Sequence, residues 1–465
     1  MVFSSLVFLG LFLPGVLILY FIIKNRVWRN LVLLLFSLLF YAWGEPIWIC
    51  AMIAVTITDY ISGLILVRLS GGARRLLVWG TVLANLALLF VFKYYNFFAE
   101  TLRGVTGLTL GEFGYAMPIG ISFFTFQSIS YVLDVNRGEV RAQKNYFYLL
   151  LYVSMFPQLI AGPIVRYADI AAQINGRKES VSGFTDGAFR FTIGLGKKVL
   201  LSNYAGSIAT ALLTDGLTGL SASGAWLGIL CYAFQIYFDF SGYSDMAIGL
   251  GKVFGFDFKE NFNYPYISRT VTEFWRRWHI SLGSFFRDYV YIPLGGNRRH
   301  PYRNIFIVWA LTGIWHGASW NFLIWGLFYG VLLFLEKLLL KRSVDMGKIR
   351  VISNLYLLMI MLYGWAIFYY TDLGQLGQFT QSLLGLNGAA ISLSLRETSA
   401  VYAYFWLLPV MAVGATPLPA RLGNRVFCKR GGGYGFKALW GLALLAASFM
   451  MILNQSYNPF LYFRF

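Results

Sequence analysis

Two short runs frame residues 273–321: Glu273-Phe-Trp-Arg-Arg-Trp-His279-Ile-Ser-Leu at the start and Leu311-Thr-Gly-Ile-Trp-His316-Gly-Ala-Ser-Trp-Asn321 at the end. The stretch holds all three histidines of the chain, His279, His300 and His316. Histidine is the side chain most often used for acid–base chemistry. His316 lies in an apolar run, 305–329, where an ionisable group is costly and commonly functional. The stretch predicts a membrane-embedded fold with a histidine-based site.

Apolar runs recur from end to end of the chain. It has 465 residues, of which 58% are hydrophobic and 12% charged, whereas soluble domains carry about 25% charged residues. A run of about 20 apolar residues is long enough to cross a bilayer as a helix, and solid apolar blocks differ from the alternating strands of a barrel. We therefore expect an all-α polytopic membrane protein with about eleven crossings, forming one domain over residues 1–465.

The expected spans are residues 5–23, 31–43, 47–66, 76–92, 190–212, 224–254, 305–327 and 324–340 (alternatively one long bent helix), 351–370, 401–419 and 438–454. The first is interpreted as an uncleaved span because no basic segment precedes it and no cleavage site follows. Residues 117–166 mix polar side chains with prolines and glycines, which predicts a broken or re-entrant helix beside a cavity. Residues 255–304 are too polar to span and indicate an interfacial layer.

The net charge of +18 does not indicate a nucleic-acid partner. The basic residues form short clusters between apolar blocks, such as 24–29, 74–75 and 298–303, as the positive-inside rule produces in cytoplasmic loops. The three cysteines, Cys50, Cys231 and Cys428, have no metal-site or redox spacing. We expect no nucleic acid and no metal.

His316 and His279 are the candidate catalytic residues. For His316 the alternative is a buried histidine bonded to a helix carbonyl, but the bilayer penalty and the adjacent glycines favour a catalytic or transport role. For His279 the alternative is an interfacial amphipathic helix rich in tryptophan. His300 lies in a basic loop and is interpreted as solvated. The chain contains no H-E-x-x-H or G-x-S-x-G motif.

Several polar residues in apolar surroundings are candidates for a supporting role. Asp239 and Asp245 are expected to orient a histidine or to hold a polar network, and Ser241 shares a helix face with Asp245. Glu336, near the end of a span beside Lys337, is interpreted as snorkelling toward the interface.

The chain resembles the membrane-bound O-acyltransferases, in the branch that O-acetylates bacterial exopolysaccharides such as alginate; teichoic-acid D-alanyl transfer proteins are more distant. The motifs that carry the resemblance are Phe156-Pro-Gln-Leu-Ile-Ala-Gly-Pro-Ile-Val-Arg166, Phe238-Asp-Phe-Ser-Gly-Tyr-Ser-Asp245, Asn261-Phe-Asn-Tyr-Pro-Tyr266, Phe274-Trp-Arg-Arg-Trp-His-Ile-Ser-Leu282, Phe286-Arg-Asp-Tyr-Val290 and Gly313-Ile-Trp-His-Gly-Ala-Ser-Trp-Asn321. They are densest in residues 117–330.

The resemblance implies a bundle of about eleven transmembrane helices, with re-entrant and interfacial helices around a central tunnel. It implies that His316 is the family's catalytic histidine and His279 the second histidine of the bacterial branch. The expected supporting or tunnel residues, all within the motifs, are Asn321, Trp315, Ser281, Asp245, Ser241, Asp239, Gln158 and Arg166. His279, with Asn321 or Ser281, is expected to orient the acceptor or stabilise an oxyanion.

The reaction implied is transfer of an acetyl group from a cytoplasmic donor, acetyl-CoA, across a bacterial inner membrane and onto an exopolysaccharide, alginate or cellulose. No permanently bound cofactor is expected. The expected partners are the donor, membrane lipids and periplasmic acetyltransferases. Three alternatives stay open: transfer of D-alanine or another acyl group, a transporter without bond-making chemistry, and a scaffold that docks periplasmic enzymes.

Overall fold

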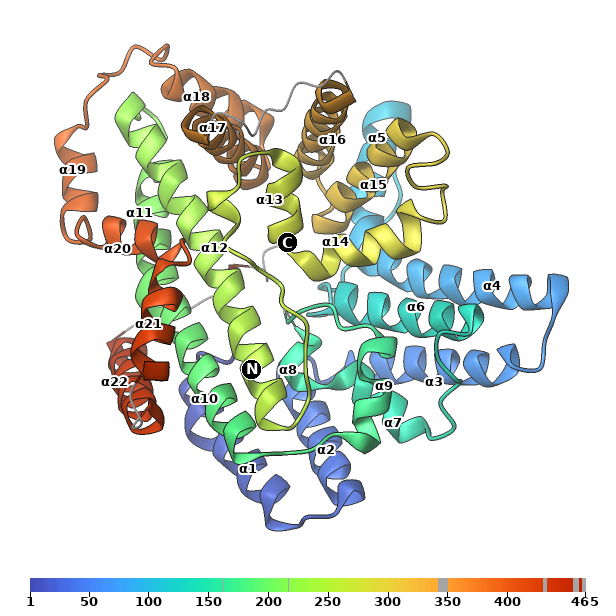
Figure 1. The fold of residues 1–465 in the computed structure, drawn as a ribbon. Coiled ribbons are helices and arrows are strands. Elements are labelled where there is room, and N and C mark those ends of the chain that lie inside the picture. The colour runs from blue at the N-terminus through green and yellow to red at the C-terminus, as the bar shows by residue number, and fades with distance from the viewer. Residues whose placement is uncertain (161, 216, 342–349, 430–432, 455–459, 462–465) are drawn as a thin grey trace. The chain divides into compact units, whose positions relative to one another are not determined.

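The computed structural model describes residues 1–160, 162–215, 217–341, 350–429, 433–454 and 460–461, and every regular element in these ranges is a helix (Figure 1). Six of the helical segments are long and apolar enough to cross a membrane, and Phe8–Ile22 is a shorter apolar one. The predicted all-α polytopic class is therefore confirmed. Chain contacts divide these helices into two compact units, residues 1–191 with 243–259, and residues 192–242 with 260–465. That the whole chain forms one domain stays a prediction.

The first unit contains the N-terminal helices. They are α1 (Leu13–Ile22), α2 (Arg26–Gly44), α3 (Ile49–Leu66), α4 (Gly71–Leu89), α5 (Tyr95–Thr106), α6 (Ile121–Arg137), α7 (Tyr146–Ser154), α8 (Phe156–Leu159), α9 (Tyr167–Gly176) and most of α10 (Val181–Gly196). The expected break within residues 117–166 is present. Helix α7 ends at Ser154 and α8 begins at Phe156, and Met155 between them has a non-helical ψ of 111°. Almost every side chain of α6 is buried, polar ones included.

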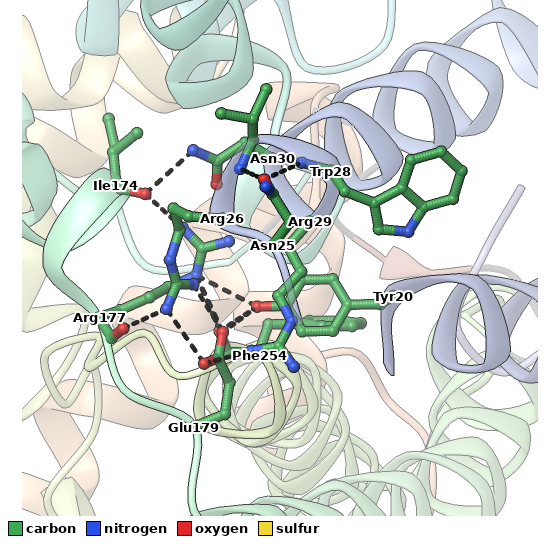
Figure 2. Close-up of polar contacts among 11 residues, drawn as sticks. Tyr20, Asn25, Arg26, Trp28, Arg29, Asn30, Ile174, Arg177, Glu179 and Phe254 are labelled. Atoms are coloured by element: carbon green, nitrogen blue, oxygen red, sulfur yellow. Dashed lines mark hydrogen bonds and ion pairs between the residues drawn. The ribbon is translucent and has the colours of Figure 1, made fainter. Parts of the chain in front are cut away.

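A buried cluster around Glu179 fastens the start of α2 to the loop that follows α9 (Figure 2). Each carboxylate oxygen of Glu179 lies 2.6 Å from one arginine, Arg26 at Oε1 and Arg29 at Oε2, and the Tyr20 hydroxyl donates to Oε1 over 2.5 Å. Burial alone would raise the pKa of Glu179, but the hydrogen bonds from Arg26 and Tyr20 outweigh it and hold this pKa below its ordinary value. The carboxylate thus stays charged and keeps the cluster together.

The second unit contains α11 (Asn203–Leu213), the first part of α12 (Ala222–Val253), and the helices that follow it. These are α13 (Val271–Arg277), α14 (Ile280–Phe286), α15 (Pro301–His316), α16 (Trp320–Lys341), α17 (Arg350–Tyr369), α18 (Leu373–Leu383), α19 (Leu395–Tyr402), α20 (Leu407–Gly414), α21 (Leu418–Lys429) and α22 (Gly433–Asn454). The short α13 and α14 agree with the expectation that residues 255–304 do not span.

Helices α15 and α16 pack backbone against backbone. A Cβ atom on Gly313 would lie 2.3 Å from the carbonyl oxygen of Phe322, and one on Gly326 would lie 2.3 Å from that of Trp309. Small residues permit such close approach between helices in membranes. Two helices are present and the single bent helix is wrong, but the predicted bounds 305–327 and 324–340 are wrong too, because α15 ends at His316 and α16 begins at Trp320.

The expected span at 401–419 is also wrong. The chain forms two short helices there, α19 and α20, with a turn between Tyr402 and Leu407. Eight-residue helices are too short to cross a bilayer. The apolar residues of this segment therefore belong to short helices and not to one spanning helix.

Candidate active site

His316 is the last residue of α15, at a sharp break in the chain. The following Gly317 is extended, with φ −170° and ψ 160°, and a Cβ atom there would lie 2.2 Å from the ring of Phe322. Only a glycine lets the chain turn this closely before α16 begins at Trp320. The break puts the imidazole of His316 at a helix end, with only 8% of the residue exposed.

His316 lines a cavity within the second unit. The other lining residues are mostly aromatic: Ile236, Asp239, Phe240, Trp278, Trp325, Trp365, Phe368 and Leu461. The cavity's single acidic lining residue, Asp239, is engaged elsewhere, as described below.

Aromatic rings fix the orientation of the His316 imidazole. The ring centroids of Trp315, Trp325 and Phe368 lie 5.0, 5.0 and 5.1 Å from its own, all in edge-on arrangements. Such contacts favour one orientation of the rings. They also exclude water from the sides of the imidazole, which strengthens any electrostatic interaction made there.

His279 lies at the junction of α13 and α14. Its φ of 45° and ψ of 53° are left-handed, a strained conformation for a residue other than glycine. The imidazole packs edge-on against Phe240, with centroids 4.6 Å apart, and against Trp315, with centroids 6.0 Å apart. His279 lies outside the apolar spans and is 2% exposed; burial lowers its pKa to about 3. Because this pKa lies far below 7, His279 is neutral at neutral pH. The ring contacts show that Trp315 touches both histidines.

Two small polar residues surround the Nδ1 atom of His279. This atom is 3.2 Å from Asn261 Oδ1 and 3.4 Å from Ser281 Oγ. Ser281 in turn donates to Asn261 Oδ1 from its hydroxyl over 2.8 Å and from its backbone N–H over 3.2 Å. Ser281 was a predicted site residue, whereas Asn261 was not, although it opens one of the motifs. The sequence signal that could have identified Asn261 is its position directly before the interfacial aromatic segment 262–266.

Asn321 is hydrogen-bonded to the last turn of helix α17. Its amide nitrogen donates to the carbonyl oxygens of Ile367 and Phe368 over 3.1 and 3.3 Å. These carbonyls belong to the last turn of α17, where no backbone partner exists within the helix. Because its N–H donors are used in this way, Asn321 supports the wall that Phe368 forms next to His316. Its expected role beside His279, to orient the acceptor or stabilise an oxyanion, stays a prediction.

Asp239 belongs to a buried polar network at the edge of the cavity. Its Oδ1 atom lies 2.6 Å from Nζ of Lys198, and both side chains are less than 5% exposed. Its Oδ2 accepts a hydrogen bond of 2.7 Å from the backbone N–H of Leu461. Asp239 was expected either to orient a histidine or to hold a polar network, and these contacts fit the second role. Lys198 was not among the predicted site residues, although a lysine within an expected span, here 190–212, signals a buried partner.

The remaining predicted residues do not line the described cavity. Ser241 is buried on α12 in the second unit, and Asp245, one turn further, belongs to the first unit, where it pairs with Arg190 over 2.9 Å. In the first unit, Gln158 donates to the Tyr152 carbonyl over 2.5 Å, and Arg166 is the residue before α9. Their supporting roles stay predictions.

Five lining residues carry no recognisable signal in the sequence: Ile236, Trp325, Trp365, Phe368 and Leu461. They come from four separate segments, and apolar or aromatic residues in apolar runs are most often simple packing residues. Among the described residues, no group of three or more His, Cys, Asp or Glu side chains is placed to hold a metal ion.

Comparison with known proteins gives one family and several curated relatives. Residues 124–371 match the model of the membrane-bound O-acyltransferase family. The chain is 39% identical, over the full length of both proteins, to a probable alginate O-acetylase of Pseudomonas putida. It is 33% identical to a peptidoglycan O-acetyltransferase of Helicobacter pylori, over 86% of this chain and 82% of that one. A teichoic acid D-alanyltransferase of Bacillus subtilis is 29% identical over 55% and 66%.

Proposed function

The chain belongs to the membrane-bound O-acyltransferase family, and from this membership we propose that it moves an acetyl group from cytoplasmic acetyl-CoA through the inner membrane for O-acetylation of an exopolysaccharide. The observation that carries the proposal is the position of His316. A helix end places this imidazole, largely buried, against a cavity lined mostly by aromatic side chains, which keeps bulk water away from the sides of the ring.

In the proposed reaction, His316 acts as general base. It accepts the proton of the acceptor hydroxyl while the hydroxyl oxygen attacks the acetyl carbonyl carbon. The carbon–sulfur bond of the thioester then breaks, and the proton passes from His316 to the leaving thiolate. No further reactant is needed. His279, which also contacts Trp315, orients the acceptor hydroxyl or the acyl carbonyl.

Alginate is the acceptor that the relatives favour, because the alginate O-acetylases match this chain over its whole length. Cellulose and peptidoglycan offer the same chemical group, a sugar hydroxyl. Transfer of D-alanine is the second candidate, but the D-alanyltransferases are less similar and match about half of the chain. The proposed partner is a periplasmic acetyltransferase that completes transfer to the polymer.

Inverted inner-membrane vesicles test the donor. They expose the cytoplasmic face, so acetyl-CoA labelled in its acetyl group is added outside, and alginate with the periplasmic fraction is enclosed. We expect label in the polymer from wild-type vesicles and none from vesicles that lack this chain. A parallel reaction uses labelled D-alanine on its carrier in place of acetyl-CoA. If label enters the polymer from D-alanine and not from acetyl-CoA, the proposal is contradicted and the second candidate is favoured.

A further inference from the structure

The segment that carries His279 is bonded to the segment that begins at Asn261. The backbone N–H of Ile280 donates to the carbonyl of Asn261 over 2.9 Å, and that of Asn263 donates to the carbonyl of Arg277 over 2.9 Å. These bonds lie on either side of His279 and hold it in its left-handed conformation. The cost of a strained residue is normally met by its surroundings, and such residues gather at functional sites.

The side chain of Asn261 has only one possible orientation in this network. Its Oδ1 atom lies 3.2 Å from the backbone nitrogen of Ser281, a group that can only donate. The Ser281 hydroxyl lies 2.8 Å from the same oxygen. An amide nitrogen in this place would face a donor, so the oxygen must occupy it.

The protonation of the His279 ring follows from this orientation. Its Nδ1 atom lies 3.2 Å from Asn261 Oδ1, which has lone pairs and no hydrogen. The second neighbour, Ser281 Oγ at 3.4 Å, already directs its hydrogen at Asn261. Nδ1 must therefore carry the proton, because the hydrogen bond made by one ring nitrogen sets the state of the other.

We propose that Asn261 is a positioning residue that holds His279 as the Nδ1–H tautomer, so that Nε2 carries the basic lone pair. The catalytic meaning of this assignment rests on the proposed function: His279 then does not donate a hydrogen bond from Nε2 to the acyl oxygen, but accepts one from the acceptor molecule, while the reacting hydroxyl gives its proton to His316. Asn261 is fully buried and His279 nearly so, so water does not compete for the Nδ1 proton.

Imidazole ¹⁵N NMR tests the tautomer without any turnover. The chain has only three histidines, so the protein in bilayers is labelled with ¹⁵N-histidine, and His300→Asn and His316→Gln variants assign the signals. We expect His279 to be neutral, protonated at Nδ1 and unprotonated at Nε2. A wild-type His279 protonated at Nε2 overturns the proposal, even if acyl transfer proceeds as proposed.

Variants of Asn261 connect the tautomer to activity. Asn261→Leu removes the acceptor, and we expect loss of the pure Nδ1–H signal together with a fall in kcat of at least about tenfold, larger than the change in KM. Asn261→Asp keeps an acceptor oxygen and should retain the Nδ1–H signal, as should Asn263→Leu, a matched change at an exposed position. An unchanged Nδ1–H signal in Asn261→Leu overturns the proposal.

Discussion

At the scale of single residues, the candidate site consists of the His316 imidazole and the groups that surround it. The rings of His316 and His279 both pack edge-on against Trp315, and all three side chains are buried. His316 could be picked out from the sequence because ionisable groups are rare in apolar runs, and His279 because it lies in one of the motifs that carry the family resemblance. Their contacts could not, since Asn261 and Phe368 reach them from distant parts of the chain.

Asn321 gives the first prediction at this scale. Replacement by alanine leaves two buried carbonyls at the end of α17 without their donor, which costs about 1–3 kcal/mol. We expect Asn321→Ala to lower the midpoint of thermal unfolding in detergent and to reduce acyl transfer, because Phe368 packs against His316. Asn263→Ala, at an exposed position, is the control. A full-length variant with unchanged midpoint and activity would show that these bonds are dispensable.

At the scale of elements, the break between α15 and α16 creates the site. The sequence predicts apolar helices over residues 305–340 but not their separation, because the decisive contact, Gly317 against Phe322, depends on how the second helix folds back. Glu336 shows the same limitation. A carboxylate beside Lys337 was expected to snorkel, whereas the structure buries it, with 4% exposed. This expectation is wrong because the start of α13 supplies three donors to Glu336.

The contact between α15 and α16 gives the second prediction. Gly313→Ala would push a methyl group to within 2.3 Å of the Phe322 carbonyl, and such overpacking costs about 1–3 kcal/mol. We expect less folded protein in the membrane and a lower unfolding midpoint in detergent. Gly80→Ala in α4 has open space around the new methyl group and should be neutral or stabilising. Equal behaviour of the two variants would contradict the close packing.

Glu336 gives the third prediction. Its Oε1 accepts from the Val271 N–H over 2.6 Å, and its Oε2 from the Thr272 N–H and hydroxyl over 2.9 and 2.7 Å. Because these bonds hold the start of α13, which leads to His279, Glu336→Gln should destabilise the protein by about 1–3 kcal/mol and displace the His279 ¹⁵N signals.

Lys337→Gln is the matched control for Glu336→Gln, since the Lys337 ammonium bonds to Asn297 and makes no bond to α13. It should leave the His279 signals in place. If Glu336→Gln leaves both the stability and the His279 signals unchanged, the carboxylate does not position α13.

At the scale of the whole molecule, family and membrane location agree with the composition. The family match, the apolar helices and the bacterial relatives confirm a multi-pass protein of the bacterial inner membrane with O-acyltransferase activity. Long apolar runs and a dense set of motifs made this predictable. The interrupted segments, such as 401–419, were not, because composition does not distinguish a spanning helix from short packed ones.

The central claim, that His316 performs the acyl transfer, is tested most directly by polymer-bound acetyl in cells that carry His316→Ala. Membrane levels of the variant are measured alongside, and His300→Asn serves as the control because His300 is exposed and asparagine tolerates its left-handed conformation. Loss of a general base typically costs 10²–10⁴-fold in rate, roughly, so we expect polymer acetyl to disappear at normal protein levels. Wild-type acetylation by His316→Ala would contradict the account and favour a scaffold for periplasmic enzymes.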